Sequence, residues 1–397
     1  MCAAGRTAIG RQPLVAAGQL KVQELSMRFK RAGPNGRGQE TTGWKVKFMA
    51  IHVLGIDIGS YAAKVVMLGN IKAGRATLLG LGMSQLPNDV VLEWEDNPAP
   101  ARTAISQAMK NLVARSKLTG KYVSTSVSGD SIIVKKIIMP VMSGDSLKKA
   151  VMEEAEQYIP FAINDVNVSY HILETSPLDN HMVVLLVAAK KSVVQNYMEA
   201  ISLAKLKPAV IDVDGLALFN AYDFLHPDQH DNVVLADIGA NMLNITVLHN
   251  GLPMIIKDEP GGGQYLTNEI ASIFDMDMAD AEAVKFGSME APNPGEVADA
   301  VDRAVGNWIA AVERVLDSAR AEDSLFRPTA IYLSGGSSLL RQLPEEFEKY
   351  FGIRVERLNP LTSTNYNAKK YDQEYLEYIG PQLAVSFGLA LRKVEVE

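Results

Sequence analysis

The feature that most constrains the fold is a strand–turn–strand pattern that occurs twice. The stretch "VLGIDIGSYAAKVVML" begins at Val53, and "VVLADIGANMLNITVLHNG" begins at Val233. In each, an apolar strand ends in Asp-Ile-Gly and a second strand follows at once, which predicts a β-hairpin with an aspartate and a glycine at its tip. One such turn occurs by chance in many chains. The second copy opens the other half of the chain, and two such hairpins facing each other would grip one ligand from both sides.

The residue types at the two tips indicate an anion held through a metal ion. Glycine lets backbone N–H groups approach an anion without a side chain in the way. An aspartate beside a phosphate becomes useful when a hard cation lies between them, and Mg²⁺ is commonly held through carboxylates and phosphate oxygens. We therefore expect Asp57 and Asp237 to hold Mg²⁺ through water, and the N–H groups around Gly59–Ser60 and Gly239–Ala240 to contact phosphate. Lys64, seven residues after Asp57, could swing back onto the phosphates; the alternative is a solvated strand lysine.

Two glycine-rich stretches extend this prediction. In "YLSGGSSLL", Gly335 and Gly336 follow a predicted strand and precede a predicted helix, a turn that suits contact with adenosine and the α-phosphate. In "EPGGGQYLTNEIASIF", a glycine run enters a helix, so we expect Gly262 and Gly263 to contact the nucleotide; a plain linker is the alternative. Arg314 lies between these stretches and either stacks on adenine or ribose or forms a surface salt bridge.

These motifs, in this order, resemble those of the actin-like ATPase superfamily. "DIGSYAAK" is similar to its first phosphate loop, "DIGANMLN" to its second and "LSGGSSLL" to its adenosine loop. "VIDVDGLALFNAY" and "PQLAVSFGLALR" resemble its two connecting segments, and the likeness spans Met49 to Arg392. The resemblance implies an α/β fold with two ribonuclease-H-like halves around a nucleotide cleft, and ATP and Mg²⁺ as ligands. The expected nucleotide contacts are Asp57, Gly59, Ser60, Lys64, Asp237, Gly239, Ala240, Asn241, Gly262, Gly263, Arg314, Gly335, Gly336 and Ser337. Tyr61 departs from the pattern, because a small residue is usual there.

An inserted subdomain is expected within the first half. The pattern reads strand ("SIIVKKIIMP"), helix ("SGDSLKKAVMEEAEQYIPF"), strand ("DVNVSYHILE") and strand ("HMVVLLVAAK"). The expected organisation is therefore a basic, disordered tail or upstream extension over 1–48, a first half (IA) over 49–130, the insert (IC) over 131–208, a return to the first half over 209–232, and a second half (IIA and IIB) over 233–397 whose last segment returns to the first.

The insert narrows the resemblance to a family. "EEAEQYIPF", "VNVSYHIL", "PGGGQYLTNEI" and "ERVLDSA" are similar to the PilM family of type IV pilus assembly proteins. The related FtsA proteins end in an amphipathic membrane-targeting helix, whereas "LRKVEVE" is short and polar. The related GspL proteins add a membrane span and a periplasmic domain, and neither pattern occurs in this sequence.

The family resemblance implies an adaptor. Such a protein is cytoplasmic, binds ATP, and reaches the inner membrane by binding the N-terminal tail of the bitopic protein PilN in the alignment complex. Other pilus assembly proteins and the motor ATPases are further candidate partners. Tyr158, Ile159, Pro160 and Phe161 are our candidates for lining or supporting the groove for the tail. The alternatives are an FtsA-like filament former and a sugar-kinase-type phosphotransferase.

Whether the chain hydrolyses ATP depends on a group that orients water. Asp214, in the first connecting segment, either takes that role or caps the helix that follows. The family resemblance implies slow or negligible turnover, with nucleotide acting as a conformational ligand.

Charge and hydropathy limit the partners. Residues 1–48 hold nine Lys/Arg and two Asp/Glu, whereas the remainder holds 30 basic and 44 acidic residues. This acidic body argues against nucleic acid as the main ligand. The basic segment 1–48 is either a nucleic-acid or membrane-surface arm, or a disordered tail upstream of a start at Met49. The longest apolar run, "MVVLLVAA", is far shorter than the ~20 residues of a membrane span. The single cysteine, Cys2, excludes a disulfide framework.

Overall fold

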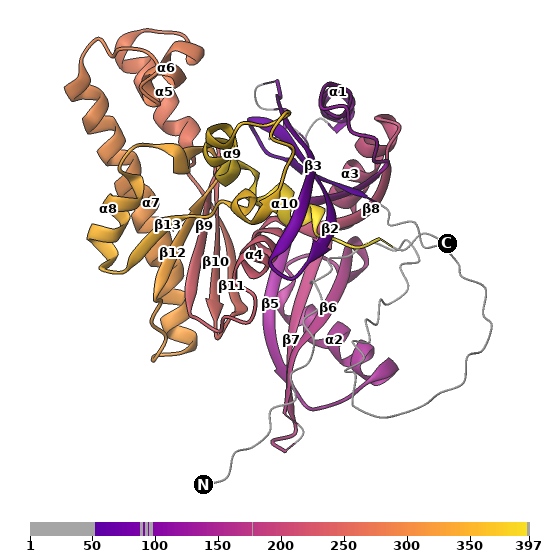
Figure 1. The fold of residues 1–397 in the computed structure, drawn as a ribbon. Helices are drawn as coiled ribbons and strands as arrows, with labels where there is room; N and C mark the ends of the chain where they lie inside the picture. Colours follow the sequence, from indigo (N-terminus) through magenta and orange to yellow (C-terminus); the bar gives the residue numbers. More distant parts are fainter. Residues whose placement is uncertain (1–51, 88–89, 92–93, 95–97, 177, 395–397) are drawn as a thin grey trace, which may run out of the picture.

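A computed structural model describes residues 52–87, 90–91, 94, 98–176 and 178–394 (Figure 1). The expectations for residues 1–48 lie outside these ranges. The described chain forms three sheets, of six, five and three strands. Among the described residues, no helix is both long and apolar enough to cross a bilayer.

The first sheet begins with the predicted meander. Strands β1 (Val53–Ile58), β2 (Ala62–Lys72) and β3 (Arg75–Gln85) pair antiparallel in sequence order. β4 (Tyr122–Val127) then pairs parallel with β1, and β8 (Lys207–Val213) pairs parallel with β4. β14 (Thr364–Asn365), from the last part of the chain, adds to the outer side of β3, so the order is β14-β3-β2-β1-β4-β8.

The second sheet repeats this topology. Strands β9 (Val233–Ile238), β10 (Met242–His249) and β11 (Leu252–Pro260) form an antiparallel meander. β12 (Ala330–Ser334) pairs parallel with β9, and β13 (Arg354–Arg357) pairs parallel with β12. The order β11-β10-β9-β12-β13 matches β3-β2-β1-β4-β8 strand for strand. The two halves that the superfamily resemblance implies are confirmed.

Helices cover both sheets. On the first half, α1 (Pro98–Arg115) and α3 (Lys191–Leu203) pack against each other. The second half carries α5 (Gly263–Phe274), α6 (Met278–Lys285), α7 (Pro294–Glu322) and α8 (Leu343–Phe351). The long helix α7 begins after Asn293, whose side chain accepts the N–H of Gly295 as an N-cap. It buries a stripe that includes Val305, Trp308 and Val312.

The third sheet is made by β5 (Ile132–Met139), β6 (Val166–Ser176) and β7 (His181–Lys190), in the order β5-β7-β6. Helix α2 (Gly144–Tyr158) comes between β5 and β6 and buries Leu147, Val151 and Ala155 against this sheet. The expected strand–helix–strand–strand order is therefore confirmed. The third sheet with α2 ends at Lys190, whereas α3 and β8 lie with α1 and β4 of the first half.

Two helices cross where the halves meet. α4 (Asp214–Leu225) packs against α10 (Ala384–Ala390) near the centre of the molecule, while α9 (Gln373–Ile379) lies just before α10 (Figure 1). Gly388 allows this crossing, because a Cβ there would overlap the backbone carbonyl of Ala217. Just beyond α10, Arg392 Nε donates to Asp212 Oδ2 at 2.6 Å, in an ion pair that is almost fully buried. The two small-residue segments predicted to connect the halves are thus in direct contact.

Candidate functional site

The two Asp-Ile-Gly hairpins line the same cavity. It has a volume of about 610 Å³ and lies between the two halves. The first hairpin contributes Asp57, Gly59, Ser60, Tyr61 and Lys64, and the second contributes Asp237, Gly239, Ala240 and Asn244. Asp214 lines it as well. The sequence prediction that the two tips face one another across a common space therefore agrees with the geometry.

The two turns close in the same way. The N–H of Gly59 donates to the carbonyl of Ala62 at 3.2 Å, and the N–H of Gly239 donates to the carbonyl of Met242 at 3.0 Å. We expected these glycine N–H groups to contact phosphate. In the structure these two N–H groups close the turns, while Gly59, Ser60, Gly239 and Ala240 all line the cavity.

A buried ion pair sets the charge of the first hairpin. Asp57 and Lys64 are register partners on β1 and β2, and Lys64 Nζ lies 2.9 Å from Asp57 Oδ2. Burial acts to lower the pKa of Lys64, but the carboxylates of Asp57, Asp237 and Asp214 together raise it. Lys64 is thus a fixed positive charge between three carboxylates, rather than a solvated strand lysine.

Asp237 has weaker compensation. Burial raises the pKa of its carboxyl, and this is offset in part by Lys64 and by the Ser334 hydroxyl, which donates to Asp237 Oδ1 at 2.6 Å. A carboxylate that is buried without a full counter-charge favours a bound cation. Among the described residues, no group of three or more His, Cys, Asp or Glu side chains has the geometry of a metal site.

Asp214 is the first residue of α4 and lines the cavity. Burial, and then the charge of Asp57, raises the pKa of Asp214 to about 7. The N-cap position of α4 is Val213, which makes no side-chain cap. Asp214 is therefore not the N-cap of α4, and it lies at the wall of the cavity.

The glycine-rich loop covers the tip of the second hairpin. The N–H of Gly263 donates to Gly239 O at 2.9 Å, and the N–H of Gln264 donates to Ala240 O at 2.7 Å. A Cβ at Gly262 would lie 2.5 Å from both carbonyl oxygens, so only glycine fits between loop and tip. Trp308 supports the loop from behind, since its Nε1 donates to Gly261 O at 2.6 Å. This loop is therefore part of the site's framework and not a plain linker.

The second glycine turn lies beside it. Gly335 has a φ of +84°, in the left-handed region, and a Cβ there would overlap the backbone of Ile238. Gly336 and Ser337 follow in a short 3₁₀ turn, Gly336–Leu339, and line the cavity. We expected a helix to start here, and the 3₁₀ turn takes its place.

Four of the expected contacts, Asn241, Gly262, Arg314 and Gly335, are not among the described residues that line the cavity. Gly262 and Gly335 make the close backbone approaches described above. The carbonyl of Asn241 accepts the N–H groups of Gly261 and Gly262. Arg314 is exposed and pairs with Glu259 at 2.7 Å, so of its two alternatives the structure has the surface salt bridge. These residues shape or flank the site.

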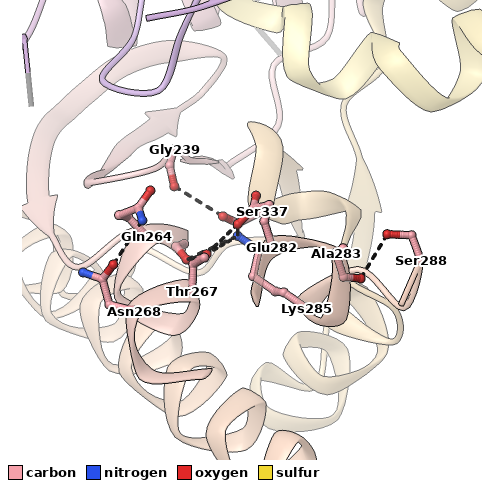
Figure 2. Close-up of polar contacts among 10 residues, drawn as sticks. Gly239, Gln264, Thr267, Asn268, Glu282, Ala283, Lys285, Ser288 and Ser337 are labelled. Atoms are coloured by element: carbon pink, nitrogen blue, oxygen red, sulfur yellow. Dashed lines mark hydrogen bonds and ion pairs between the residues drawn. The ribbon is translucent and has the colours of Figure 1, made fainter. Parts of the chain in front are cut away.

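A polar cluster on α5 and α6 was missed by sequence reasoning (Figure 2). Lys285 is buried, and its Nζ donates to Thr267 Oγ1 at 2.9 Å and to Glu282 Oε2 at 2.6 Å. Burial lowers the pKa of Lys285, and Glu282 offsets part of this effect. Glu282, Lys285 and Gln264 all line the cavity. In the sequence, a Glu and a Lys three residues apart on a helix look like an ordinary surface pair.

The candidate groove residues lie at the end of α2. Tyr158 is 41% exposed, and Pro160 is exposed as well. Ile159 is buried in the core of the third sheet, where it can support a groove but not line it. Phe161 lies under Lys190, with Nζ 4.7 Å from the ring centre, and Lys190 itself lines the cavity.

Two halves with one strand order, enclosing a cavity between glycine-tipped hairpins, define the actin-like ATPase fold. A similar solved structure is that of the ethanolamine utilization protein EutJ from Carboxydothermus hydrogenoformans. Its TM-score is 0.50 at 17% identity, with 86% of this chain and 89% of that chain covered.

Within this fold, the chain belongs to the family of the type IV pilus assembly protein PilM, whose sequence model matches residues 55–394. The chain is also similar to a solved structure described as the "PilM-PilN type IV pilus biogenesis complex". That match has a TM-score of 0.76 at 28% identity and covers 88% of this chain and 100% of that chain.

Proposed function

We propose that this protein is a cytoplasmic, ATP-binding adaptor of the type IV pilus assembly machinery, which binds the N-terminal tail of a PilN-like inner-membrane protein. Family membership over residues 55–394 supports a role in pilus assembly. The similar solved structure is a complex of PilM with PilN, which supports the choice of partner. The single observation that carries ATP binding is the cavity that both Asp-Ile-Gly hairpins line.

The residues of the cavity fit a magnesium-bound nucleotide. Asp57 and Asp237 are our candidates for holding Mg²⁺ through its water shell, which suits an ion that gives up water reluctantly. When bound, Mg²⁺ would neutralise phosphate charge. Ser60 and Ala240 are our candidates for backbone contacts to the phosphates, and Lys64 of the first hairpin is our candidate cationic contact. Gly263, Gly336 and Ser337 form the wall for the adenosine, with Glu282 and Lys285 beside them.

Asp214 is our candidate for orienting an attacking water. A pKa of about 7 leaves a substantial fraction of its carboxyl ionised at neutral pH, which suits a general base. We expect turnover to be slow, with nucleotide acting chiefly on the angle between the halves. Nucleotide can change this angle only through the difference in its affinity for the two arrangements of the halves.

The tail of the partner is proposed to lie near Tyr158, Pro160 and Phe161, supported by Ile159. An extended peptide can bind in a groove where alternate side chains fill pockets. Exposed aromatic side chains are favoured anchors for such a peptide. The contact between Phe161 and Lys190 brings this region to the wall of the cavity.

The partner is tested by calorimetric titration of the protein with a synthetic peptide of the PilN-like tail, with and without Mg-ATP. We expect saturable binding, and at least a tenfold loss in Tyr158→Ala, as for an aromatic anchor. Tyr350→Ala is the matched control, because Tyr350 is an exposed tyrosine on α8. Absence of saturable binding under both conditions would refute the partner assignment.

Nucleotide binding is tested separately, by titration with Mg-ATP. We expect Asp237→Asn to weaken binding about 10–100-fold, the range for residues that orient a metal's ligands. The variant should bind ATP in EDTA about as well as the wild type does. An equal loss with and without the metal would contradict the role given to Asp237.

A further inference from the structure

A polar row crosses the second sheet from the nucleotide cavity to the insert. Asp237, Asn244 and Asp258 are register partners on the adjacent strands β9, β10 and β11. Register partners lie on the same face of a sheet. Asn244 Nδ2 donates to Asp258 Oδ1 at 2.6 Å, and Asn244 is only 5% exposed. The row therefore begins at the aspartate of the second hairpin and ends at Asp258.

The other oxygen of Asp258 holds a segment from the first half. Asp258 Oδ2 accepts the N–H of Gly129 at 2.5 Å. Gly129 lies between β4 of the first sheet and β5 of the third, so it is where the chain enters the insert. Its φ of +90° favours glycine, and the segment Ser128–Ser131 lines the cavity. One carboxylate thus joins the second sheet to the entry of the insert.

The middle of the row has an unused acceptor. Asn244 Oδ1 is buried and has no hydrogen-bond partner among the described residues. Leaving a buried acceptor unsatisfied destabilises the site, so a ligand that supplies a donor is favoured. Asn244 lines the cavity beside Asp237, and Asp258 fixes its amide so that the oxygen is left for a ligand. A water bound to a divalent cation is such a donor.

The insert also contacts the second half elsewhere. Lys135 and Lys136 on β5 lie 3.6 and 3.7 Å from Glu322 at the end of α7. Leu185 and Val187 of β7 share an apolar cluster with Val233, Leu235 and Leu248 of the second sheet. A shift of the second sheet therefore acts on the insert through more than one contact. Among these contacts, the one through Asp258 begins at the hairpin tips, where the phosphates are proposed to bind.

We propose that Asp258 is a positioning residue that couples the phosphate end of the cavity to the insert. A ligand bound at Asn244 Oδ1 restrains the Asn244 amide further. The hydrogen bonds that Asp258 accepts from Asn244 and from Gly129 then hold the entry of the insert in one position. This inference rests on the proposed function, in that the ligand is Mg-ATP and the insert carries the partner's tail. By linkage, the tail must then change the affinity for Mg-ATP by the same factor.

The test compares the tail-peptide Kd with and without saturating Mg-ATP in the full chain and its variants. In the wild type we expect Mg-ATP to change this Kd by at least about fivefold, the lower end of typical coupling. In Asp258→Asn, one of the two oxygens that accept from Gly129 and Asn244 becomes an NH₂ donor, so the ratio should fall below about twofold, with the nucleotide-free Kd little changed. Asn244→Ala breaks the row from its other side and should have the same effect. Glu259→Gln, one residue along β11 and paired with Arg314, is the matched control and should keep the wild-type ratio.

The proposal is overturned if Mg-ATP changes the tail-peptide Kd in Asp258→Asn and Asn244→Ala as much as in the wild type. It is also overturned if Mg-ATP leaves this Kd unchanged in the wild type. If the peptide binds none of the proteins, the proposed partner is wrong, and the coupling is then judged without it. In that case amide hydrogen exchange across β5 is measured with and without Mg-ATP. Slower exchange in the wild type that is lost in Asp258→Asn supports the coupling, and an equal response in both proteins refutes it.

Discussion

The β1–β2 and β9–β10 hairpins occupy the same place in their sheets, yet the residue paired with each aspartate differs. Asp57 is the register partner of Lys64, whereas Asp237 is the register partner of Asn244. The first hairpin therefore neutralises its own carboxylate with an ion pair of 2.9 Å. In the second, the Ser334 hydroxyl donates to the carboxylate, and the register partner Asn244 directs its amide N–H to Asp258 instead. One backbone motif thus supplies a fixed ion pair in one half and an under-compensated carboxylate in the other.

The tips differ as well. The second tip is covered by the glycine-rich loop, which donates backbone N–H groups to its carbonyl oxygens. At the first tip, a Cβ on Gly59 would meet its nearest atom, the Ala62 carbonyl oxygen, at 3.4 Å. The first hairpin is thus a charged element with room at its tip, and the second is a framework element fixed by its neighbours. Comparable substitutions in the two hairpins should therefore have different effects.

The largest effect should come from the ion pair. Lys64→Met removes the cation and leaves Asp57 buried near Asp214 and Asp237, so we expect a loss of about 3–5 kcal/mol in the free energy of unfolding at pH 7. Urea denaturation measures it. Lys72→Met, an exposed lysine at the far end of the same strand, should stay within about 0.5 kcal/mol of the wild type. A loss below about 1 kcal/mol for Lys64→Met would show that the first hairpin does not depend on its own counter-charge.

The next prediction concerns Asp214, whose pKa is raised in part by the charge of Asp57 on the first hairpin. Its folded-state pKa of about 7 lies above its ordinary value of 3.8, chiefly through burial and then through Asp57. Between these two pH values the folded chain holds this proton more tightly than the unfolded chain, so the group's contribution to stability falls as the pH rises. Asp214→Asn removes that loss, and the variant should gain on the wild type between pH 5 and pH 8, by about 2.5–3 kcal/mol.

Urea denaturation at the two pH values measures this gain, with Asp302→Asn on the exposed side of α7 as the control for losing one carboxylate. If the advantage of Asp214→Asn is the same at pH 5 and pH 8, Asp214 does not titrate in this range and the raised pKa is wrong. The same variant, assayed for ATP hydrolysis, shows whether turnover depends on this carboxyl.

The fold could be predicted from sequence because its signals are local and repeated. Each Asp-Ile-Gly turn lies within a strand pair that alternates with helices, and the order of the motifs specifies two matching halves. The limits of the third sheet were harder to place, because α3 follows β7 directly with no loop between Lys190 and Lys191. The packing of α3 on α1, β4 and β8 shows which half it accompanies.

The site was predictable where a residue lies on a turn and not where it depends on a distant contact. Asp57 and Asp237 are among the last residues of their strands, beside the turns, and Gly336 and Ser337 come just after a strand, so topology places them in a shared cavity. Lys285 lies on a helix with no special local pattern, and its burial depends on packing between α5 and α6. Asp258 has no sequence signal at all, because its partner Gly129 is 129 residues away.

The covered tip of the second hairpin gives the next prediction. In Gly262→Ala the new Cβ would lie 2.5 Å from the carbonyl oxygens of Gly239 and Ala240, and backbone atoms cannot move aside as a flexible side chain can. We expect a loss of about 1–3 kcal/mol in unfolding free energy, the cost of overpacking a tight site. Gly59→Ala at the first tip should cost less than about 0.5 kcal/mol. Equal losses for the two variants would contradict the difference drawn between the tips.

The smallest effect should come from Arg314, which approaches the second hairpin's sheet from outside. Its salt bridge with Glu259 joins a side chain that is 59% exposed to one that is 23% exposed, so Arg314→Ala should change the unfolding free energy by less than about 1 kcal/mol. The affinity for Mg-ATP should not change, because Arg314 is not among the described residues that line the cavity. A titration with Mg-ATP beside the wild type decides the matter. A tenfold loss would mean that Arg314 leaves Glu259 to contact the nucleotide when it binds.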